Sequence, residues 1–291
     1  MKLVTYKGKN GQCAGAVTAD GSGVINACEV TGRDFPDVLS LIRGADENDL
    51  AKLREASAGG SAEKLSSVTL MPPIEHPPHD VICVGVNYLA HREETSKIRE
   101  EKYDQPDPIF FGKRAVRIIG DGEYVDFDDK LDPALDYEVE LAVIIGRTCR
   151  NVAPEDAEDV IFGYSVFNDL SSRTLQKKHV QWLHGKSLDT YTAMGPWIVT
   201  KDEISFPPAL KIMSRVNGEV RQESDTSLFI NDIPALISTF SQNTTLEPGD
   251  IIATGTPGGV AMAMEPPGYM THGDKVECEI EGIGTLTNYI K

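Results

Sequence analysis

Three acidic side chains alternate with other residues along a strand-like run at residues 135–145. Because successive side chains of a strand point to opposite faces, we expect Asp136, Glu138 and Glu140 on one face, which becomes apolar further along the strand. Carboxylates this close repel each other, and burial raises their pKa values. A hard divalent cation relieves both effects because it prefers oxygen ligands. The spacing therefore indicates a metal site, with an exposed strand face carrying ordinary acids as the alternative.

A further acid, Asp169, follows a second strand-like run at residues 161–168. Side chains at the ends of strands are often used to build functional sites. Taken alone, the segment is more typical of a helix start, in which Asp169 or Ser171 would cap the helix. Both interpretations stay open from these residues.

His91 and Glu94 lie three residues apart in a highly charged segment, residues 91–102, whose composition favours a helix. On a helix the two side chains would share a face, where the carboxylate would orient the imidazole and raise its basicity. Such a pair suits a general base that moves a proton or activates water. A solvated charged helix is the alternative, and the low apolar content is also typical of a mobile lid.

Two glycine-containing segments could offer positive groups to an anion. Lys186 follows Gly185, so its ammonium group can approach a ligand closely and neutralise an enolate or a carboxylate. The loop at residues 253–260 can present backbone N–H groups and the Thr256 hydroxyl, although it lacks the lysine and spacing of a P-loop. Ordinary turns are the alternative in both places.

The composition is that of a globular protein and excludes several classes. The chain has 291 residues, 40% of them hydrophobic, which is enough for a sizeable core. A formal net charge of -17 disfavours nucleic-acid and anionic-membrane partners. No apolar run is long enough to span a bilayer, and residues 1–6 lack the apolar core of a signal peptide. Scattered cysteines without a CxxC pair indicate neither a disulfide framework nor a zinc site, so we expect a cytoplasmic protein.

The elements that must position these residues are mostly strands. Glycines predict a hairpin or meander over residues 1–30, and apolar spacing predicts a helix over 34–56. A Pro-rich connector at 71–78 places a boundary near 75, between a small domain (1–75) and a larger one (76–291). The class expected is mixed α and β, rich in strands, without regular βαβ alternation. Further strands are predicted at 80–88, near 109, and at 135–145, 161–168, 195–200, 210–217, 250–255 and 275–290, and helices near 154–160, after 169 and at 231–240.

Several motifs, taken in order, resemble those of the fumarylacetoacetate hydrolase family. The residues and the order of these motifs together identify the family far more specifically than any single motif does. The motifs cover roughly residues 80–290. Residues 1–75 resemble the small variable N-terminal domain of the family less specifically. The matching segments are GVNYLAH (85–91), PIFFGK (108–113), DYEVEL (136–141), FND (167–169), GKSLD (185–189), MGPW (194–197) and GTPGGV (255–260).

The resemblance implies a β-sandwich or roll with outer helices, a homodimer, and a bound Mg²⁺ or Mn²⁺, with Ca²⁺ also possible. By motif match, Glu138, Glu140 and Asp169 look like the metal ligands. Asp136 matches a family acid that is not normally a ligand. The other matches are Lys186 as the site lysine, His91 and Glu94 as the catalytic pair on the lid, and Gln176 and Thr256 as substrate-contacting residues.

The resemblance also implies an enzyme that acts on a 2-oxo or β-diketo acid through an enolate stabilised by the metal. We expect an isomerase of the 2-hydroxydienoate type or a C–C hydrolase of the acylpyruvate type, from aromatic catabolism. An oxaloacetate-type decarboxylase is the alternative, because one intermediate serves several reactions and membership of a family does not choose among them. A catalytically silent ligand-binding protein on the same scaffold is the non-enzyme alternative, and the retained site residues argue against it.

One departure from the family pattern concerns the substrate. After Lys113 the family often has a proline and a small polar residue, but this chain continues Arg-Ala-Val-Arg. Arg114 and Arg117 are therefore predicted to bind the distal carboxylate of a dioic acid, with Arg117 as the main candidate. The alternative is a surface arginine that balances Asp121 and Glu123.

Overall fold

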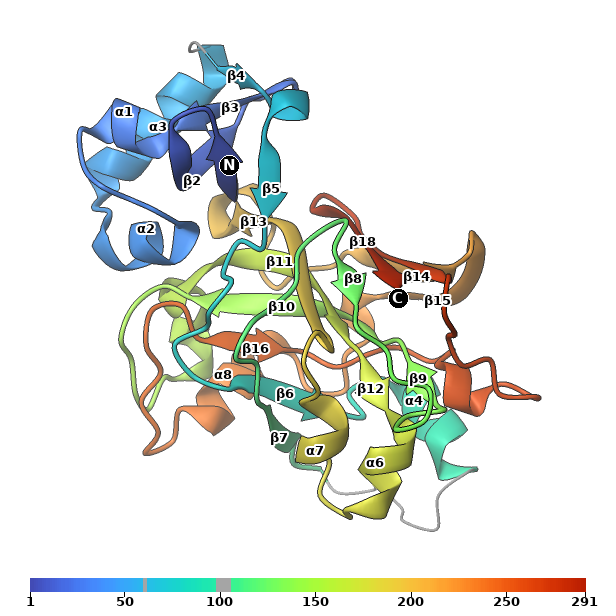
Figure 1. Ribbon diagram of the computed structural model, residues 1–291. Helices are drawn as coiled ribbons and strands as arrows, with labels where there is room; N and C mark the ends of the chain where they lie inside the picture. The colour runs from blue at the N-terminus through green and yellow to red at the C-terminus, as the bar shows by residue number, and fades with distance from the viewer. Residues whose placement is uncertain (60–61, 98–105) are drawn as a thin grey trace.

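The structure is a computed structural model that describes residues 1–59, 62–97 and 106–291. Among these residues, an eleven-stranded sheet runs through the molecule, a five-stranded sheet packs against it, and helices lie around both (Figure 1). A short two-stranded sheet completes the arrangement. The strand-rich mixed class predicted from the sequence is therefore confirmed.

The large sheet has the order β4-β3-β2-β1-β13-β11-β10-β16-β6-β7, with β5 paired to β1. Its strand pairs are antiparallel, apart from the parallel pair of β16 and β6. The strands are β1 (Lys2–Gly8), β2 (Gly11–Val17), β3 (Gly23–Asn26), β4 (Glu63–Lys64), β5 (Thr69–Met71), β6 (Val81–Gly85), β7 (Ile109–Lys113), β10 (Val139–Ile145), β11 (Ile161–Asp169), β13 (Thr192–Thr200) and β16 (Ile251–Ala253).

The other sheets and the helices are shorter. The five-stranded sheet has the order β15-β14-β17-β18-β8, and β9 pairs with β12. These strands are β8 (Tyr124–Val125), β9 (Leu135–Asp136), β12 (Ser171–Ser172), β14 (Lys211–Val216), β15 (Glu219–Asp225), β17 (Lys275–Ile280) and β18 (Gly284–Ile290). The α-helices are α1 (Ala27–Thr31), α2 (Val38–Gly44), α3 (Glu47–Gly59), α4 (Leu89–Ser96), α5 (Ala157–Val160), α6 (Arg173–Lys178), α7 (Leu183–Lys186) and α8 (Ile233–Phe240). The 3₁₀ turns are η1 (Leu65–Ser67), η2 (Pro154–Asp156), η3 (Lys201–Glu203), η4 (Thr226–Leu228) and η5 (Ala261–Ala263).

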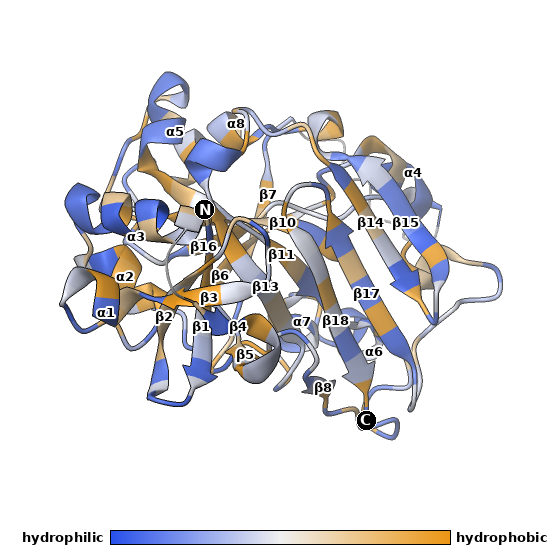
Figure 2. Ribbon diagram, turned by 90° about the horizontal axis from the view of Figure 1, so that it is seen from above, coloured by the Kyte–Doolittle hydropathy of each residue, from blue (hydrophilic) through white to orange (hydrophobic). Residues whose placement is uncertain are grey.

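The central strand β10 separates two hydrophobic cores. Leu141 and Val143 face a core that also holds the inward side chains of β14, β17 and β18. Ala142 and Ile144 face a second core, closed by residues of α1, α2 and α3. Figure 2 shows the same alternation of apolar and polar residues along β17. Because both faces are covered, the face that carries the acids becomes apolar along the strand, as the sequence predicted.

The prediction of one continuous strand over 135–145 is wrong, because the chain forms two strands there. Leu135 and Asp136 form β9, which pairs with β12, and β10 begins only at Val139. Between them, the Glu138 N–H donates to the Asn168 side chain at 3.1 Å rather than to a neighbouring backbone carbonyl. A side chain that competes for backbone hydrogen bonds interrupts a ladder. The interruption allows Asp136 to leave the sheet that carries the other acids.

The helix predicted over 34–56 is two helices, α2 and α3. Asp37 caps α2 in a capping box with Ser40, and the helix ends at Ala45, whose backbone is extended. The Asp46 side chain then accepts the Asp49 N–H at 2.9 Å and starts α3. Polar side chains therefore cap the start of each of the two helices, and a single helix would not need the second cap.

The N-terminal strands belong to the large sheet. β1 pairs with β13 in the register Leu3 to Ile198, so the strands of residues 2–71 extend the sheet that carries the site residues. The boundary proposed near residue 75 falls in the connector between β5 and β6. The division into two domains stays a prediction.

We expect the connector to contribute a pH-dependent term to stability through His79. Its Nδ1 lies 2.6 Å from Asp250 Oδ1, and this hydrogen bond raises the pKa of His79. A raised pKa stabilises the fold below the ordinary pKa of histidine, and the contribution is lost as pH rises through the raised value. Because the His79 side chain is 56% exposed, the term should stay below about 1 kcal/mol.

Urea denaturation of the wild type and His79→Gln at several pH values between about 6 and about 9 would check this. The excess free energy of unfolding of the wild type should shrink as pH rises. An excess that grows with pH would contradict the assignment.

Candidate metal centre and catalytic site

Three carboxylates from two neighbouring strands converge as the sequence indicated. Glu138 precedes β10, Glu140 lies on it, and Asp169 ends β11. The antiparallel register pairs Val139 with Asn168, and the Asp169 N–H donates to the Glu138 carbonyl at 2.9 Å. One oxygen of each acid lies within 4.8 Å of the others, and all three side chains are buried. The helix-cap alternative for Asp169 is wrong, because Ser172 caps α6 by accepting the Leu175 N–H.

Buried cations surround this triad of acids. Lys186 Nζ lies 2.6 Å from Glu138 Oε2 and 2.7 Å from Asp169 Oδ2. Lys113 Nζ lies 2.6 Å from Asp169 Oδ1, and Arg173 Nη2 lies 2.6 Å from Glu138 Oε1. Sequence reasoning gave no role to Lys113 or Arg173. A lysine at the end of the apolar run Ile-Phe-Phe-Gly was the available signal for Lys113, because a cation in such a strand needs a buried partner.

The protonation of the acids depends on these neighbours. Burial would raise the pKa of Glu138, but Lys186 and Arg173 hold it well below its usual value. Burial, followed by repulsion from Asp169 and Glu138, raises the pKa of Glu140. Complete burial lowers the pKa of the Lys113 ammonium despite its contact with Asp169. Opposite shifts in neighbouring groups are typical of a site built for charge chemistry.

Lys186 reaches the acids because Gly185 permits a close contact between two helices. A Cβ atom at Gly185 would lie 2.5 Å from the backbone nitrogen of Gln176, so any larger residue would push α7 away from α6. The segment predicted as a possible turn is therefore a short helix in which glycine has a packing role. The same contact brings Gln176 and Lys186 to one side of the site.

One loop orients three different carboxylates through its backbone. The Gly255 N–H donates to Glu140 at 2.8 Å, and the Gly259 N–H donates to Glu94 at 2.8 Å. The N–H groups of Ala261 and Met262 donate to Asp136 at 2.8 Å and 3.1 Å. The loop predicted over residues 253–260 thus offers the N–H groups of Gly255 and Gly259 to the protein's own acids, and the 3₁₀ turn η5 that follows supplies the two that hold Asp136.

The Thr256 hydroxyl is already engaged within the protein. It donates to the Val139 carbonyl at 2.9 Å and accepts from Gln222 Nε2 at 2.7 Å. Thr256 lines the cavity next to the triad, so the structure brings it to the site. Its role as a substrate contact stays a prediction.

His91 and Glu94 lie on α4 and pair as the spacing predicted. His91 Nδ1 lies 2.7 Å from Glu94 Oε1, and the imidazole is buried and lines the cavity. Because Nδ1 is engaged by the carboxylate, Nε2 is the nitrogen that can serve a ligand. The helix predicted over 91–102 is described from residue 89 to residue 96, and residues 98–102 of that prediction lie outside the described residues.

The structure brings Gln176 to the site but not Arg117. Gln176 lines the cavity and accepts from Arg173 Nη1 at 3.1 Å. Arg117 does not line it, and its guanidinium is held by Glu75 at 2.7 Å and Glu123 at 2.5 Å. These ion pairs match the surface interpretation of Arg117 and leave no group of this side chain in the cavity.

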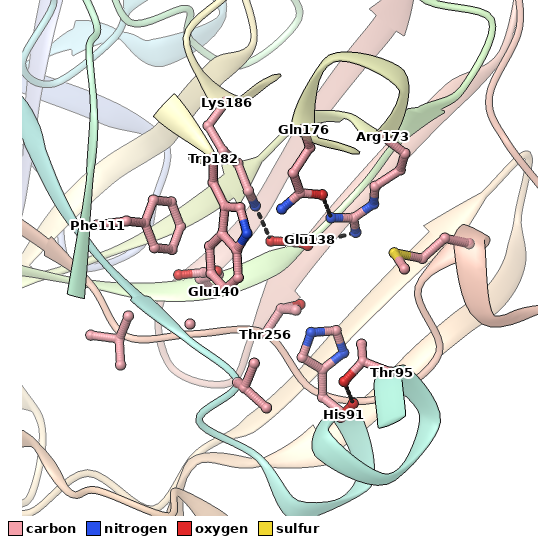
Figure 3. Close-up of a pocket in the computed structure, with 14 residues that line it drawn as sticks. His91, Thr95, Phe111, Glu138, Glu140, Arg173, Gln176, Trp182, Lys186 and Thr256 are labelled. Carbon is pink, nitrogen blue, oxygen red and sulfur yellow. Dashed lines mark hydrogen bonds and ion pairs between the residues drawn. The ribbon is translucent and has the colours of Figure 1, made fainter. Parts of the chain in front are cut away.

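The side chains converge on one narrow cavity (Figure 3). Figure 3 shows Lys186 and Gln176 on one side of Glu138, His91 and Thr95 on another, and Phe111 and Trp182 on a third. The cavity is lined by Val84, Gly85, Val86, His91, Thr95, Phe111, Glu138, Glu140, Arg173, Gln176, Trp182, Lys186, Thr256 and Met262.

The donor set of the triad fits a hard divalent cation. The three candidate ligands are carboxylates, which is the chemistry that Mg²⁺, Mn²⁺ and Ca²⁺ prefer. Among the described residues, Asp136 and the triad are four buried acids, and they face the three buried cations Lys113, Arg173 and Lys186. When all four acids are ionised, one negative charge has no cationic side chain to offset it, which agrees with the raised pKa of Glu140, and a bound cation would compensate that charge.

Replacing Asp136 with asparagine is expected to destabilise the fold by about 3–5 kcal/mol, because it breaks a buried ion pair. Asp136 is fully buried and holds Arg173 Nε at 2.8 Å together with two N–H groups of the loop. Urea denaturation of Asp136→Asn measures the loss, and Asp189→Asn, at an exposed position, is the control. A loss no greater than that of the control would show that Asp136 does not hold the site together.

No helix among the described residues is long and apolar enough to cross a membrane. Sequence comparison adds a family match to this site. The family model for the fumarylacetoacetate (FAA) hydrolase C-terminal region matches residues 80–291. That range contains every candidate site residue named above.

Three known proteins illustrate the similarity. Oxaloacetate tautomerase YisK of Bacillus subtilis is 44% identical over 241 residues, which cover 82% of this chain and 79% of that protein. The mitochondrial oxaloacetate tautomerase FAHD2A of Bos taurus is 38% identical over 298 residues, covering 100% of this chain and 91% of that protein. The solved structure of a fumarylacetoacetate hydrolase from Exiguobacterium antarcticum matches with a TM-score of 0.85 and 38% identity, covering 100% of this chain and 99% of that chain.

Proposed function

Because this chain belongs to the fumarylacetoacetate hydrolase family, and is therefore similar to metal-dependent enzymes, we propose that it catalyses the keto–enol tautomerisation of oxaloacetate. Two similar proteins carry that activity in their names. Tautomerisation is an isomerase reaction, so the proposal lies within the isomerase class expected from the sequence and changes the substrate.

One observation supports the proposal most strongly. A histidine–glutamate pair that can transfer a proton shares a cavity with acids of the carboxylate triad. His91, with Nδ1 fixed by Glu94, and the acids Glu138 and Glu140 line the same cavity. Tautomerisation moves one proton from carbon 3 of oxaloacetate and adds one to the keto oxygen. It requires a base at the carbon and positive charge at the oxygen, and no water or leaving group.

The residues divide this work between them. His91 Nε2 accepts the proton from carbon 3, Glu94 stabilises the imidazolium that results, and the imidazolium then gives this proton to the keto oxygen, which completes the enol. The Lys186 ammonium, which is fully buried among the acids, lies where it can oppose charge on the substrate oxygens. Gln176, held through its carbonyl by Arg173, turns its amide Nε2 toward a substrate carboxylate.

Glu138, Glu140 and Asp169 would hold a divalent ion, for which we propose Mg²⁺ or Mn²⁺, with Ca²⁺ as a further possibility. When bound, that ion supplies Lewis-acid stabilisation of negative charge on a 2-oxo acid. Lys113 and Arg173 then act as positioning residues, because each fixes one oxygen of a ligand acid.

C–C bond hydrolysis is the second candidate, favoured by the name of the similar solved structure. In that reaction His91 would activate a water molecule instead of receiving a proton from carbon. Turnover of 2-hydroxydienoates or acylpyruvates from aromatic catabolism, and decarboxylation of oxaloacetate, belong to the same proposal of metal-assisted enolate chemistry. They share the site and differ in the bond that changes.

A single panel of assays tests these reactions. Ultraviolet absorbance follows loss of the enol of oxaloacetate, pyruvate release reports decarboxylation, and acylpyruvate cleavage reports hydrolysis. Each assay is run after prolonged EDTA dialysis and again with Mg²⁺, Mn²⁺ or Ca²⁺. We expect metal-dependent interconversion of enol and keto forms without pyruvate release. No acceleration of tautomerisation with any metal, or full activity after metal removal, would refute the proposal.

We also propose a homodimer, as the resemblance to the family implies, located in the cytoplasm, as the scattered cysteines of the sequence suggest. Size-exclusion chromatography with light scattering measures the mass of the assembly. A monomer at assay concentration would contradict the dimer. The relative from Bos taurus is named as mitochondrial, so localisation of a tagged chain in its own cell is the test of compartment.

A further inference from the structure

We propose that Trp182, supported by Phe111 and Gly85, is the stop that restricts this site to 2-oxo acids about the size of oxaloacetate. The inference rests on the proposed function because it assumes that a 2-oxo acid occupies the cavity. It goes further by naming the side chain that sets the upper size of the substrate.

The indole ring of Trp182 is held in place by close packing against its neighbours. A Cβ atom at Gly85 would lie 2.6 Å from Cζ3 and 3.0 Å from Cη2 of the indole, so the ring lies directly against β6 where only glycine leaves room. The ring also meets Phe111 on the neighbouring strand β7 edge-on, with centroids 5.1 Å apart and an interplanar angle of 74°. Contacts with two strands hold the ring more firmly than one contact would.

The indole also belongs to the same turn of chain as the site lysine. The Trp182 carbonyl accepts the Lys186 N–H at 3.1 Å, and Lys186 Nζ lies 5.4 Å from the centre of the Phe111 ring. Figure 3 shows the indole crossing in front of Glu140. Because Trp182 lines the same cavity as Glu138 and Glu140, a substrate bound at the triad would lie beside this ring.

The lining of the cavity has a polar part and an apolar part, which suit different groups of a ligand. Acids, Lys186, Gln176 and His91 form a polar part that suits the carboxylate and keto oxygens shared by all 2-oxo acids. The apolar part consists of Val84, Gly85, Val86, Phe111, Trp182 and Met262. Because the polar part recognises only the common head group, the apolar part must discriminate between substrates by size.

An apolar wall can act in two opposite ways. As a stop, it excludes any group longer than the head. As a platform, it binds an apolar tail and so favours a longer acylpyruvate. The ring is packed against both β6 and β7, at Gly85 and Phe111, so a tail cannot displace it without disturbing the sheet. This packing favours the stop, and the two roles predict opposite effects of removing the ring.

The test compares Trp182→Ala and Trp182→Phe with the wild type on oxaloacetate and on an aryl-substituted acylpyruvate, both with Mg²⁺. We expect kcat/KM for the larger acid, relative to oxaloacetate, to rise at least about tenfold in Trp182→Ala and by less in Trp182→Phe. Leu183→Ala, the exposed neighbour on α7, is the control and should leave the ratio unchanged. A lower or unchanged ratio in Trp182→Ala would overturn the proposal.

Fluorescence gives a readout that does not depend on turnover. The chain has two tryptophans, and Trp197 does not line the cavity. In a Trp197→Phe variant the emission therefore comes from Trp182 alone. We expect oxalate added with Mg²⁺ to change that emission with a saturable dependence on concentration. Saturable binding of oxalate by calorimetry without any change in emission would show that the ring does not meet the ligand.

These outcomes separate the two proposals. If the wild type does not tautomerise oxaloacetate but turns over another 2-oxo acid, the proposed function fails. Calorimetric affinities of oxalate and the larger acid still test the stop, because Trp182→Ala should bind the larger acid more tightly than the wild type does. If oxaloacetate is tautomerised and the size ratio does not respond to Trp182→Ala, only the stop is wrong.

Discussion

Glu138→Ala is expected to abolish divalent-metal binding and to reduce turnover to the uncatalysed background. Glu138 is the acid that both Lys186 and Arg173 contact, at 2.6 Å each, so its loss removes a ligand and leaves two buried cations with one acid fewer. Positive charge without its partner then disfavours a cation in the same space. Metal content after dialysis, measured by inductively coupled plasma spectrometry, and enol-to-keto rates with added Mg²⁺ are the two measurements.

A pair of amide variants separates ligand loss from loss of stability. Glu138→Gln and Glu140→Gln should both lose metal, but only Glu138→Gln should be clearly less stable by urea denaturation. Lys186 and Arg173 contact Glu138, whereas the pKa of Glu140 is raised by burial, so an uncharged amide resembles its protonated form. Glu93→Ala, at an exposed position on α4, is the control for both measurements. Normal metal content in Glu138→Ala would refute the ligand assignment.

His91→Ala is expected to lower kcat by about 10²–10⁴-fold while leaving the metal bound. His91 lines the cavity, and among the described residues its imidazole is hydrogen-bonded to Glu94, 2.7 Å from Nδ1, and not to the triad. Proton transfer from carbon 3 should therefore become slower, while all three metal ligands remain in place. Steady-state kinetics and metal content are measured on the same preparation, with Glu93→Ala again as the control.

Glu94→Gln should show a smaller fall in kcat than His91→Ala. The amide can still contact the imidazole, but it cannot stabilise the imidazolium that forms when the proton is accepted. Loss of metal from His91→Ala would show that the imidazole serves as a metal ligand. A kcat of His91→Ala close to that of the wild type would show that His91 takes no part in proton transfer.

Much of the site was readable from local spacing. Period-two alternation placed Glu138 and Glu140 on one face, and a separation of three residues placed His91 beside Glu94. Both patterns follow from covalent geometry that any strand or helix imposes, so they needed no knowledge of the rest of the chain. The motifs likewise predicted the family, which the match over residues 80–291 confirmed.

Other parts of the site depend on partners distant in sequence. Asp169 meets Glu138 only through the register of β10 with β11, and Lys113 reaches Asp169 across 56 positions of the chain. Arg117 looked suited to a substrate carboxylate, but it lies in ion pairs with Glu75 and Glu123. Spacing along the chain carries no information on which of several acids an arginine will meet.

The sequence by itself determined the acids on each strand, the histidine–glutamate pair and the family. Only the tertiary structure decided that Asp136 anchors Arg173 outside the triad, that backbone N–H groups of residues 255–262 hold three carboxylates, and that Trp182 lines the same cavity as the acids. The physical reason is that periodicity is set by neighbours along the chain. Burial, charge compensation and close packing are set by the segments that the fold brings together.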